Sequence, residues 1–232
     1  MQNQTHTVGF SGLLQDLWRS LGQEMLNSEL MPKAVLPAFE SFSSVLISAY
    51  GEPHRAYHSH QHLVECLENL QTVKGLIDKG QQLKIEMALW FHDAIYDVRA
   101  HDNEAKSAAW AEQFLENVQA TSAFKEDVKT LIMATCHSGG AASEGSLESW
   151  IIDIDLSILG SDENRFDEYE QQIRQEYAFV PAAVFNEKRS EILQGFLNRP
   201  QIFMNAFFHL TKEMLARNNL NRALASWQIN LS

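Results

Sequence analysis

The sequence contains little cysteine and little proline. Among its 232 residues there are 2 cysteines and 5 prolines. Cys66 and Cys136 lie far apart and do not form a Cys-x-x-Cys pair, which argues against a disulfide framework and against a zinc site built from thiolates. Each lies in an apolar segment, so we interpret both as small residues of the core.

Basic residues are also scarce, and long apolar runs are missing. The 18 lysines and arginines face 30 acidic residues, which gives a formal net charge of -12. This charge argues against a nucleic acid or an anionic membrane as the main partner. No apolar run reaches the roughly 18 residues that span a bilayer. The N-terminal "MQNQTHTVGF" lacks the basic and apolar regions of a secretory signal. We therefore expect a cytoplasmic protein that does not bind membranes.

The apolar residues that are present recur at helical spacing, and strand-like alternation is rare, which predicts an all-α fold. The predicted helices start near Ser11, run from Ala34 to Gly51, from Pro53 to about Val73, from Ile85 to Tyr96, from Asn103 to Val118, from Phe124 to Cys136, from Trp150 to Leu159, and continue over 162–231. The small, polar loop 138–149 is the only candidate boundary. Because predicted site residues lie on both sides of it, we expect one domain over 1–232, with a core at about 53–160 and a C-terminal helical extension at about 161–232.

Histidines gather in the segment "YHSHQHLVECL", which begins at Tyr57. On a helix, His54, His58 and His62 would share one face, because residues four apart are neighbours. His60 would point elsewhere, and we interpret it as a surface residue. Several imidazoles on one face favour metal or proton chemistry over a plain core.

Two further segments place carboxylates among apolar residues. "ALWFHDAIYD" contains His92 and Asp93, and "WIIDIDLSILG" contains Asp153 and Asp155. A buried carboxylate is costly unless a cation or several hydrogen-bond donors stabilise it. A shell of imidazoles and carboxylates suits manganese, iron, zinc, nickel or magnesium better than calcium. With three or four protein ligands, coordination positions stay open for water and substrate, as in catalytic sites.

The ordered set "RAYH", "WFHDAIYD", "NEAKSA", "DIDLSILG", "IRQEYAFVP" and "ARNNL" resembles the HD superfamily of metal-dependent phosphohydrolases. The resemblance covers roughly residues 53–220. It implies an HD-domain-like helical bundle with additional C-terminal helices, and hydrolysis of a phosphate ester or nucleotide by metal-activated water. It also implies the following metal ligands: His58, with His62 as the alternative; His92; Asp93; and Asp155, with Asp153 as the alternative.

A mechanistic hypothesis adds further roles. We expect catalytic contributions from Asp97, His62 and His137, and phosphate contacts from Arg55, Lys106 and Arg174. The partner would be a small phosphorylated substrate, with nucleotides among the candidates, and a homodimer is left open. Tyr96 stands where alarmone hydrolases of the superfamily carry a glutamate, which argues against that activity. Two other functions are left open: a catalytically silent regulatory module that binds a metal or nucleotide, and a di-iron oxygenase.

Overall fold

The structure, a computed structural model, describes residues 3–136 and 142–229, and the side chains of 9–136 and 142–226. All regular elements in these ranges are helices, and no strand forms in them, which confirms the all-α prediction. The chain divides into two compact units, Met1–Ala141 and Ala142–Ser232. The division falls in the loop that the sequence marked, rather than near residue 160. Each unit is described here by itself, and the single-domain assignment stays a prediction.

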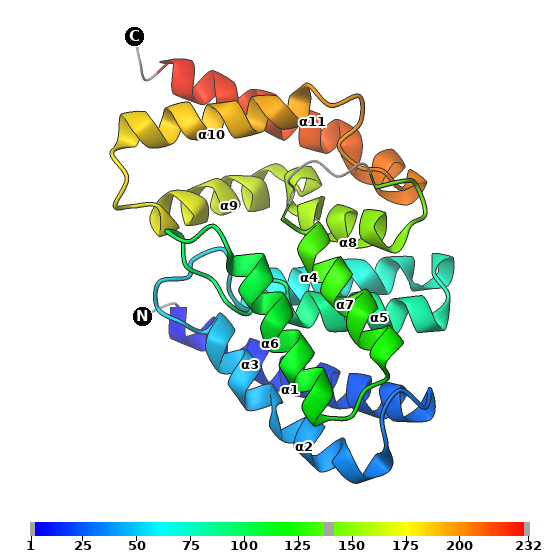
Figure 1. Cartoon of the computed structure of the whole chain (residues 1–232). Helices are drawn as coiled ribbons and strands as arrows, with labels where there is room; N and C mark the ends of the chain where they lie inside the picture. The colour runs from blue at the N-terminus through cyan, green and yellow to red at the C-terminus, as the bar shows by residue number, and fades with distance from the viewer. Residues whose placement is uncertain (1–2, 137–141, 230–232) are drawn as a thin grey trace. The chain divides into compact units, whose positions relative to one another are not determined.

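The first unit contains the helices that lead to the histidine and aspartate motifs (Figure 1). They are α1 (Asn3–Asn27), η1 (Lys33–Val35), α2 (Leu36–Ser41), α3 (Ser43–Tyr50), α4 (His60–Val73), η2 (Lys74–Leu76), α5 (Lys79–Phe91), α6 (Asn103–Asn117) and α7 (Ser122–Ala134). Helix α5 contacts α1, α4, α6 and α7. All its residues from Ile85 to Phe91 are buried, which explains why this segment is apolar apart from Glu86.

Aromatic side chains fill the core of the first unit. The ring of Trp18, on α1, stacks on Phe39 with centroids 4.5 Å apart and meets the edge of Trp90, on α5, at 5.0 Å. The Nε1 group of Trp18 donates a hydrogen bond of 2.7 Å to the carbonyl of Phe39. These contacts fix α5, so the position of its last turn is set by the core.

Helix α4 begins later than the sequence predicted, which corrects the histidine stripe. Its N-cap is Ser59, so two of the three histidines of the predicted stripe, His54 and His58, precede the helix. Of the three, only His62 lies on α4. His60 is buried rather than exposed, because its Nε2 atom hydrogen-bonds to the carbonyl of Ile47 at 2.6 Å. The helix ends at Val73, as predicted.

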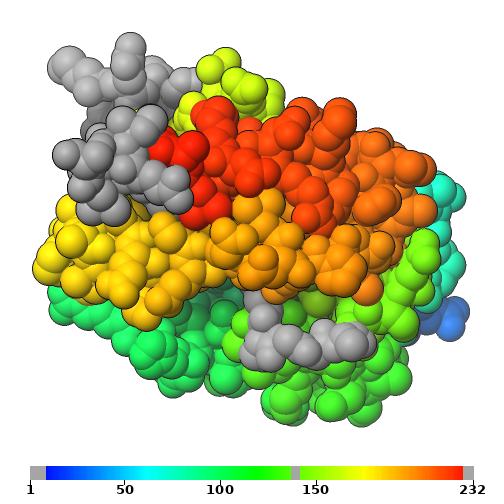
Figure 2. Space-filling model, turned by 90° about the horizontal axis from the view of Figure 1, so that it is seen from above, coloured from blue at the N-terminus to red at the C-terminus, as the bar shows by residue number. Residues whose placement is uncertain are grey.

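The second unit contains α8 (Leu147–Asp155), η3 (Leu156–Gly160), α9 (Glu163–Glu176), α10 (Ala182–Leu197) and α11 (Ala206–Ile229). Helices α10 and α11 contact each other and lie side by side in Figure 2. Gly160 permits the close packing of η3 on α11, since a Cβ atom at this position would lie 2.6 Å from the Cβ of Lys212. None of the described helices combines the length and the apolar character needed to cross a membrane.

Candidate metal centre

The His92-Asp93 doublet lies at the C-terminal end of α5, which stops at Phe91 instead of reaching Tyr96. His92 is 1% exposed, and its Nδ1 atom lies 2.8 Å from the carbonyl oxygen of Leu89. Because a carbonyl only accepts hydrogen bonds, Nδ1 must carry the proton. The Nε2 atom is therefore the His92 nitrogen that faces His62 and Asp93, and it is the atom that could bind a metal.

Two further ligand atoms converge next to this nitrogen. The Nε2 atoms of His62 and His92 are 3.1 Å apart, and the Oδ2 atom of Asp93 lies 3.3 Å from the former and 3.2 Å from the latter. We call these three atoms the ligand triangle. Ligands that bind one ion at about 2.0–2.2 Å with angles between 90° and 109° lie about 2.8–3.6 Å apart. The triangle therefore has the size that a single divalent ion requires.

The charge state of Asp93 also suits a cation. Burial by itself would raise the pKa of this carboxyl, but the imidazoles of His92, His58 and His62 hold the pKa well below its usual value. The carboxylate is therefore ionised and can only accept hydrogen bonds. It faces two imidazole nitrogens, so the triangle needs a proton or a cation to be stable.

His58 lies beside the triangle rather than in it. Its ring stacks on Tyr96 with centroids 4.1 Å apart, and its centroid is 5.9 Å from that of His62. Between the two histidines that the resemblance left open, the geometry favours His62 as the ligand. His54 is exposed, and its Nε2 atom hydrogen-bonds to the carbonyl of Tyr96 at 2.8 Å.

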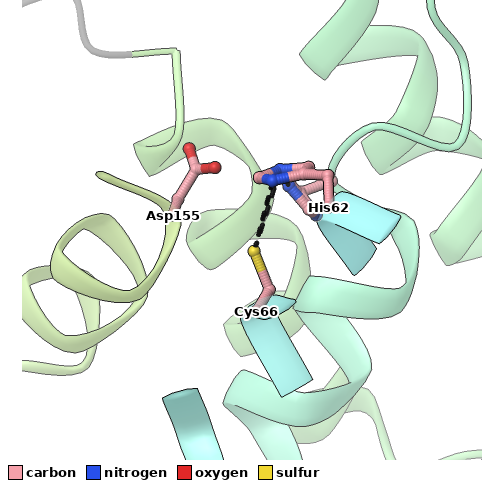
Figure 3. Close-up of side chains that lie close together, drawn as sticks. His62, Cys66 and Asp155 are labelled. Atoms are coloured by element: carbon pink, nitrogen blue, oxygen red, sulfur yellow. Dashed lines mark hydrogen bonds between the residues drawn. The ribbon is translucent and has the colours of Figure 1, made fainter. Parts of the chain in front are cut away.

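Cys66 is the site residue that the sequence analysis missed. Its Sγ atom lies 3.7 Å from both ring nitrogens of His62 (Figure 3), and His62, Cys66 and His92 each offer a ligand atom within 4.8 Å of the others. Equal distances to both nitrogens put the sulfur beside the ring rather than in line with one lone pair. The spacing of four residues from His62 to Cys66 on α4 was the available signal.

Of the two aspartates left open in the second unit, Asp153 has a structural role. It is fully buried, and its carboxylate accepts hydrogen bonds from the main-chain N of Met204 (2.9 Å) and from the main-chain N and Nδ2 of Asn205 (2.7 and 2.8 Å). Burial raises the pKa of Asp153 to about 6, although these hydrogen bonds act in the opposite direction. Asp153 therefore anchors the segment that leads into α11.

Asp155 is the last residue of α8 and is partly exposed. Its charge contributes to raising the pKa of Tyr169, on α9, after the larger effect of burial. The assignment of Asp155 as a metal ligand concerns the second unit and stays a prediction.

The three side chains predicted to contact phosphate all have other partners in the structure. Arg55 is buried, and its guanidinium donates hydrogen bonds to main-chain carbonyls of the first unit. Arg174 donates to the carbonyls of Tyr177 (2.6 Å) and Val180 (3.1 Å), just beyond the end of α9. Lys106 is exposed and forms an ion pair of 2.8 Å with Asp102, one turn earlier on α6.

Asp97 lies in the loop after α5 and is exposed. Its Oδ1 atom accepts a hydrogen bond of 2.9 Å from the main-chain N of Arg99, and its main chain is bonded at both N and O to the side chain of Asn103. These bonds tie the loop to the start of α6. The catalytic role of Asp97 stays a prediction, and His137 lies outside the described residues.

Comparisons with protein families, with curated proteins and with solved structures find no match to this chain.

Proposed function

We propose that this protein is a metal-dependent phosphohydrolase of the HD type that acts on a small phosphorylated substrate. The observation that carries the proposal is the ligand triangle, with its edges of 3.1, 3.2 and 3.3 Å. Two buried histidines and one ionised aspartate form it, from two segments that are about 30 residues apart in the chain. A metal centre explains why these polar groups converge inside an apolar interior.

Each residue of the triangle has a definite part in the proposal. His62, His92 and Asp93 would hold one divalent ion, with Asp155 as the ligand predicted from the resemblance. Such an ion, when bound, polarises a phosphate oxygen and lowers the pKa of a water molecule toward about 7. The Leu89 carbonyl accepts a hydrogen bond from Nδ1 of His92, so Nε2 is the nitrogen of this ring that would bind the ion.

The proposal is tested by metal analysis together with hydrolysis of a panel of phosphorylated metabolites in the presence of Mn²⁺, Mg²⁺, Ni²⁺, Zn²⁺ or Fe²⁺. His92→Ala and Asp93→Asn are expected to lose both bound metal and hydrolysis. His54→Ala is the matched control, because this histidine is exposed and bonds to a main-chain carbonyl; it should keep both. Unchanged metal content and turnover in both site variants would contradict the proposal.

The same experiment separates the alternatives. One exchangeable divalent ion with turnover supports the phosphohydrolase. Bound metal without turnover on any phosphoester supports the silent regulatory module, and two irons per chain support an oxygenase.

A further inference from the structure

Arg55 connects the two segments of the first unit that carry the site residues. Its Nη1 atom donates to the carbonyls of His58 (3.0 Å) and Asp93 (2.7 Å), and its Nη2 atom donates to the carbonyl of Ala94 (3.0 Å). Its Nε atom pairs with Glu52 at 3.0 Å. One side chain thus bonds the loop before α4 to the turn after α5.

The surroundings hold this guanidinium in place. The side chain of Arg55 has 0% exposure, and its Cζ atom lies 5.3 Å from the ring centroid of Tyr50 and 5.4 Å from that of Tyr96. The planar fork of arginine donates along fixed directions, so the three carbonyls must keep their spacing. A lysine has one ammonium group and cannot reproduce this spacing.

These contacts bear directly on the ligand triangle. The carbonyl bonded at 2.7 Å belongs to Asp93, whose carboxylate forms two edges of the triangle. The carbonyl of His58 belongs to the loop that leads into α4, and α4 carries His62. A shift of either segment would change the distances between the three ligand atoms.

We infer that Arg55 is the positioning residue of the metal centre, because its guanidinium fixes the main chain of Asp93 against the loop that precedes His62. This inference rests on the proposed metal site and extends it to a residue that touches neither metal nor substrate. It replaces the phosphate contact that the sequence predicted for Arg55.

The test is Arg55→Lys, with the affinity for Mn²⁺ or Co²⁺ measured by titration calorimetry on the full chain. Loss of a residue that orients ligands typically weakens metal binding about 10- to 100-fold, and we expect a change of this size. The visible spectrum of the Co²⁺ complex should also change, because it reports the angles between the ligands. A folded Arg55→Lys variant with wild-type affinity and spectrum would overturn the inference.

Arg217 offers a matched control in the second unit. Its Nε atom pairs with Glu213 at 2.7 Å, and its terminal nitrogens donate to the carbonyls of Leu197, Arg199 and Pro200 at 3.0, 2.9 and 3.2 Å. Arg217→Lys removes the same kind of fork, so it should lower the melting temperature and leave metal affinity unchanged. If Arg217→Lys loses as much metal affinity as Arg55→Lys, the loss in both variants is explained by lower stability of the fold. That result would overturn the inference.

If Arg55→Lys does not fold, a second variant tests the same inference. Glu52 is 45% exposed at its side chain, so Glu52→Gln should fold while it loosens the Nε atom of Arg55. We expect metal affinity to fall by at least about twofold, a weaker effect than that of an orienting residue itself. Wild-type affinity in Glu52→Gln would then overturn the inference. If the wild-type chain itself binds no metal, the proposed function fails. If the wild-type chain binds metal and the variants bind it equally well, only the inference about Arg55 fails.

Discussion

At the scale of single residues, the candidate metal centre depends on which nitrogen of each imidazole is protonated. The Leu89 carbonyl decides this for His92, and Asp93 is ionised because the imidazoles around it outweigh its burial. Neither feature can be derived from residue identity alone, because each requires a neighbour at hydrogen-bond distance. His62 takes part because α4 directs its ring at His92, with ring centroids 5.2 Å apart.

A pair of variants tests the choice between the two candidate histidine ligands. His62→Ala should abolish metal binding, because it removes one corner of the ligand triangle. His58→Ala should keep the ion bound, because its ring stacks on Tyr96 outside the triangle. Metal content per chain after dialysis is the measurement. The reverse result, with metal lost only in His58→Ala, would return the ligand role to His58.

At the scale of helices, α5 combines a core function with a buried acid. Glu86 is 5% exposed, and burial raises its pKa to about 7, while Lys74, with Nζ 3.9 Å from its Oε2 atom, acts in the opposite direction. Glu24 and Lys79 also act on it, with opposite signs. An acid with a raised pKa binds its proton more tightly when folded, so it stabilises the fold at low pH.

This gives a prediction for stability against pH. The contribution of Glu86 is present below its usual pKa of 4.5 and is lost as pH rises through about 7. Glu86→Gln should therefore raise the free energy of unfolding at pH 8 by about 2 kcal/mol. In this variant the free energy of unfolding should also fall less steeply between pH 4.5 and about 7. Urea denaturation across pH measures this. Glu116→Gln, at a side chain that is 60% exposed, is the control and should leave the profile unchanged.

The start of α11 gives a second prediction at this scale. Asp153 accepts three hydrogen bonds from Met204 and Asn205, and Asn205 in turn accepts one from the hydroxyl of Ser149 at 3.2 Å. Asp153→Asn turns one acceptor into a donor that faces other donors, so we expect a loss of about 2 kcal/mol in the free energy of unfolding at neutral pH. Denaturant unfolding followed by tryptophan fluorescence checks this. Stability equal to the wild type would show that Asp153 does not anchor α11.

At the scale of the whole molecule, the chain forms two compact units, and the predicted ligands are divided between them. The ligand triangle lies in the first unit, and Asp155 lies in the second. The triangle alone meets the size requirement for one ion, so the first unit supplies three candidate ligands without help from the second.

Asp155→Asn tests the contribution of the second unit. If Asp155 is a ligand, as the resemblance implies, this variant should bind Mn²⁺ at least about tenfold more weakly, because an amide is a poorer ligand than a carboxylate. Its stability should stay close to that of the wild type, since Asp155 is partly exposed. Calorimetry measures both. Unchanged affinity in Asp155→Asn would limit the metal centre to the first unit.

The sequence by itself determined the all-α class and the segment that carries His92 and Asp93. Both follow from local patterns: the helical spacing of apolar residues, and an aspartate among buried neighbours that needs a counter-charge. The ends of α4 at Val73 and of α3 next to Gly51, and the start of α6 at Asn103, were also predicted correctly.

Only the tertiary structure decided which of the remaining polar residues join the site. Helix α4 begins at His60 rather than at Pro53, so His62 faces His92 while His58 stacks on Tyr96. Arg55 was expected to bind phosphate, but it bonds to carbonyls 3, 38 and 39 residues away in the chain. The physical reason is that the role of these side chains depends on ring contacts and on hydrogen bonds to main-chain carbonyls that folding brings near, and most of these partners are distant in the sequence.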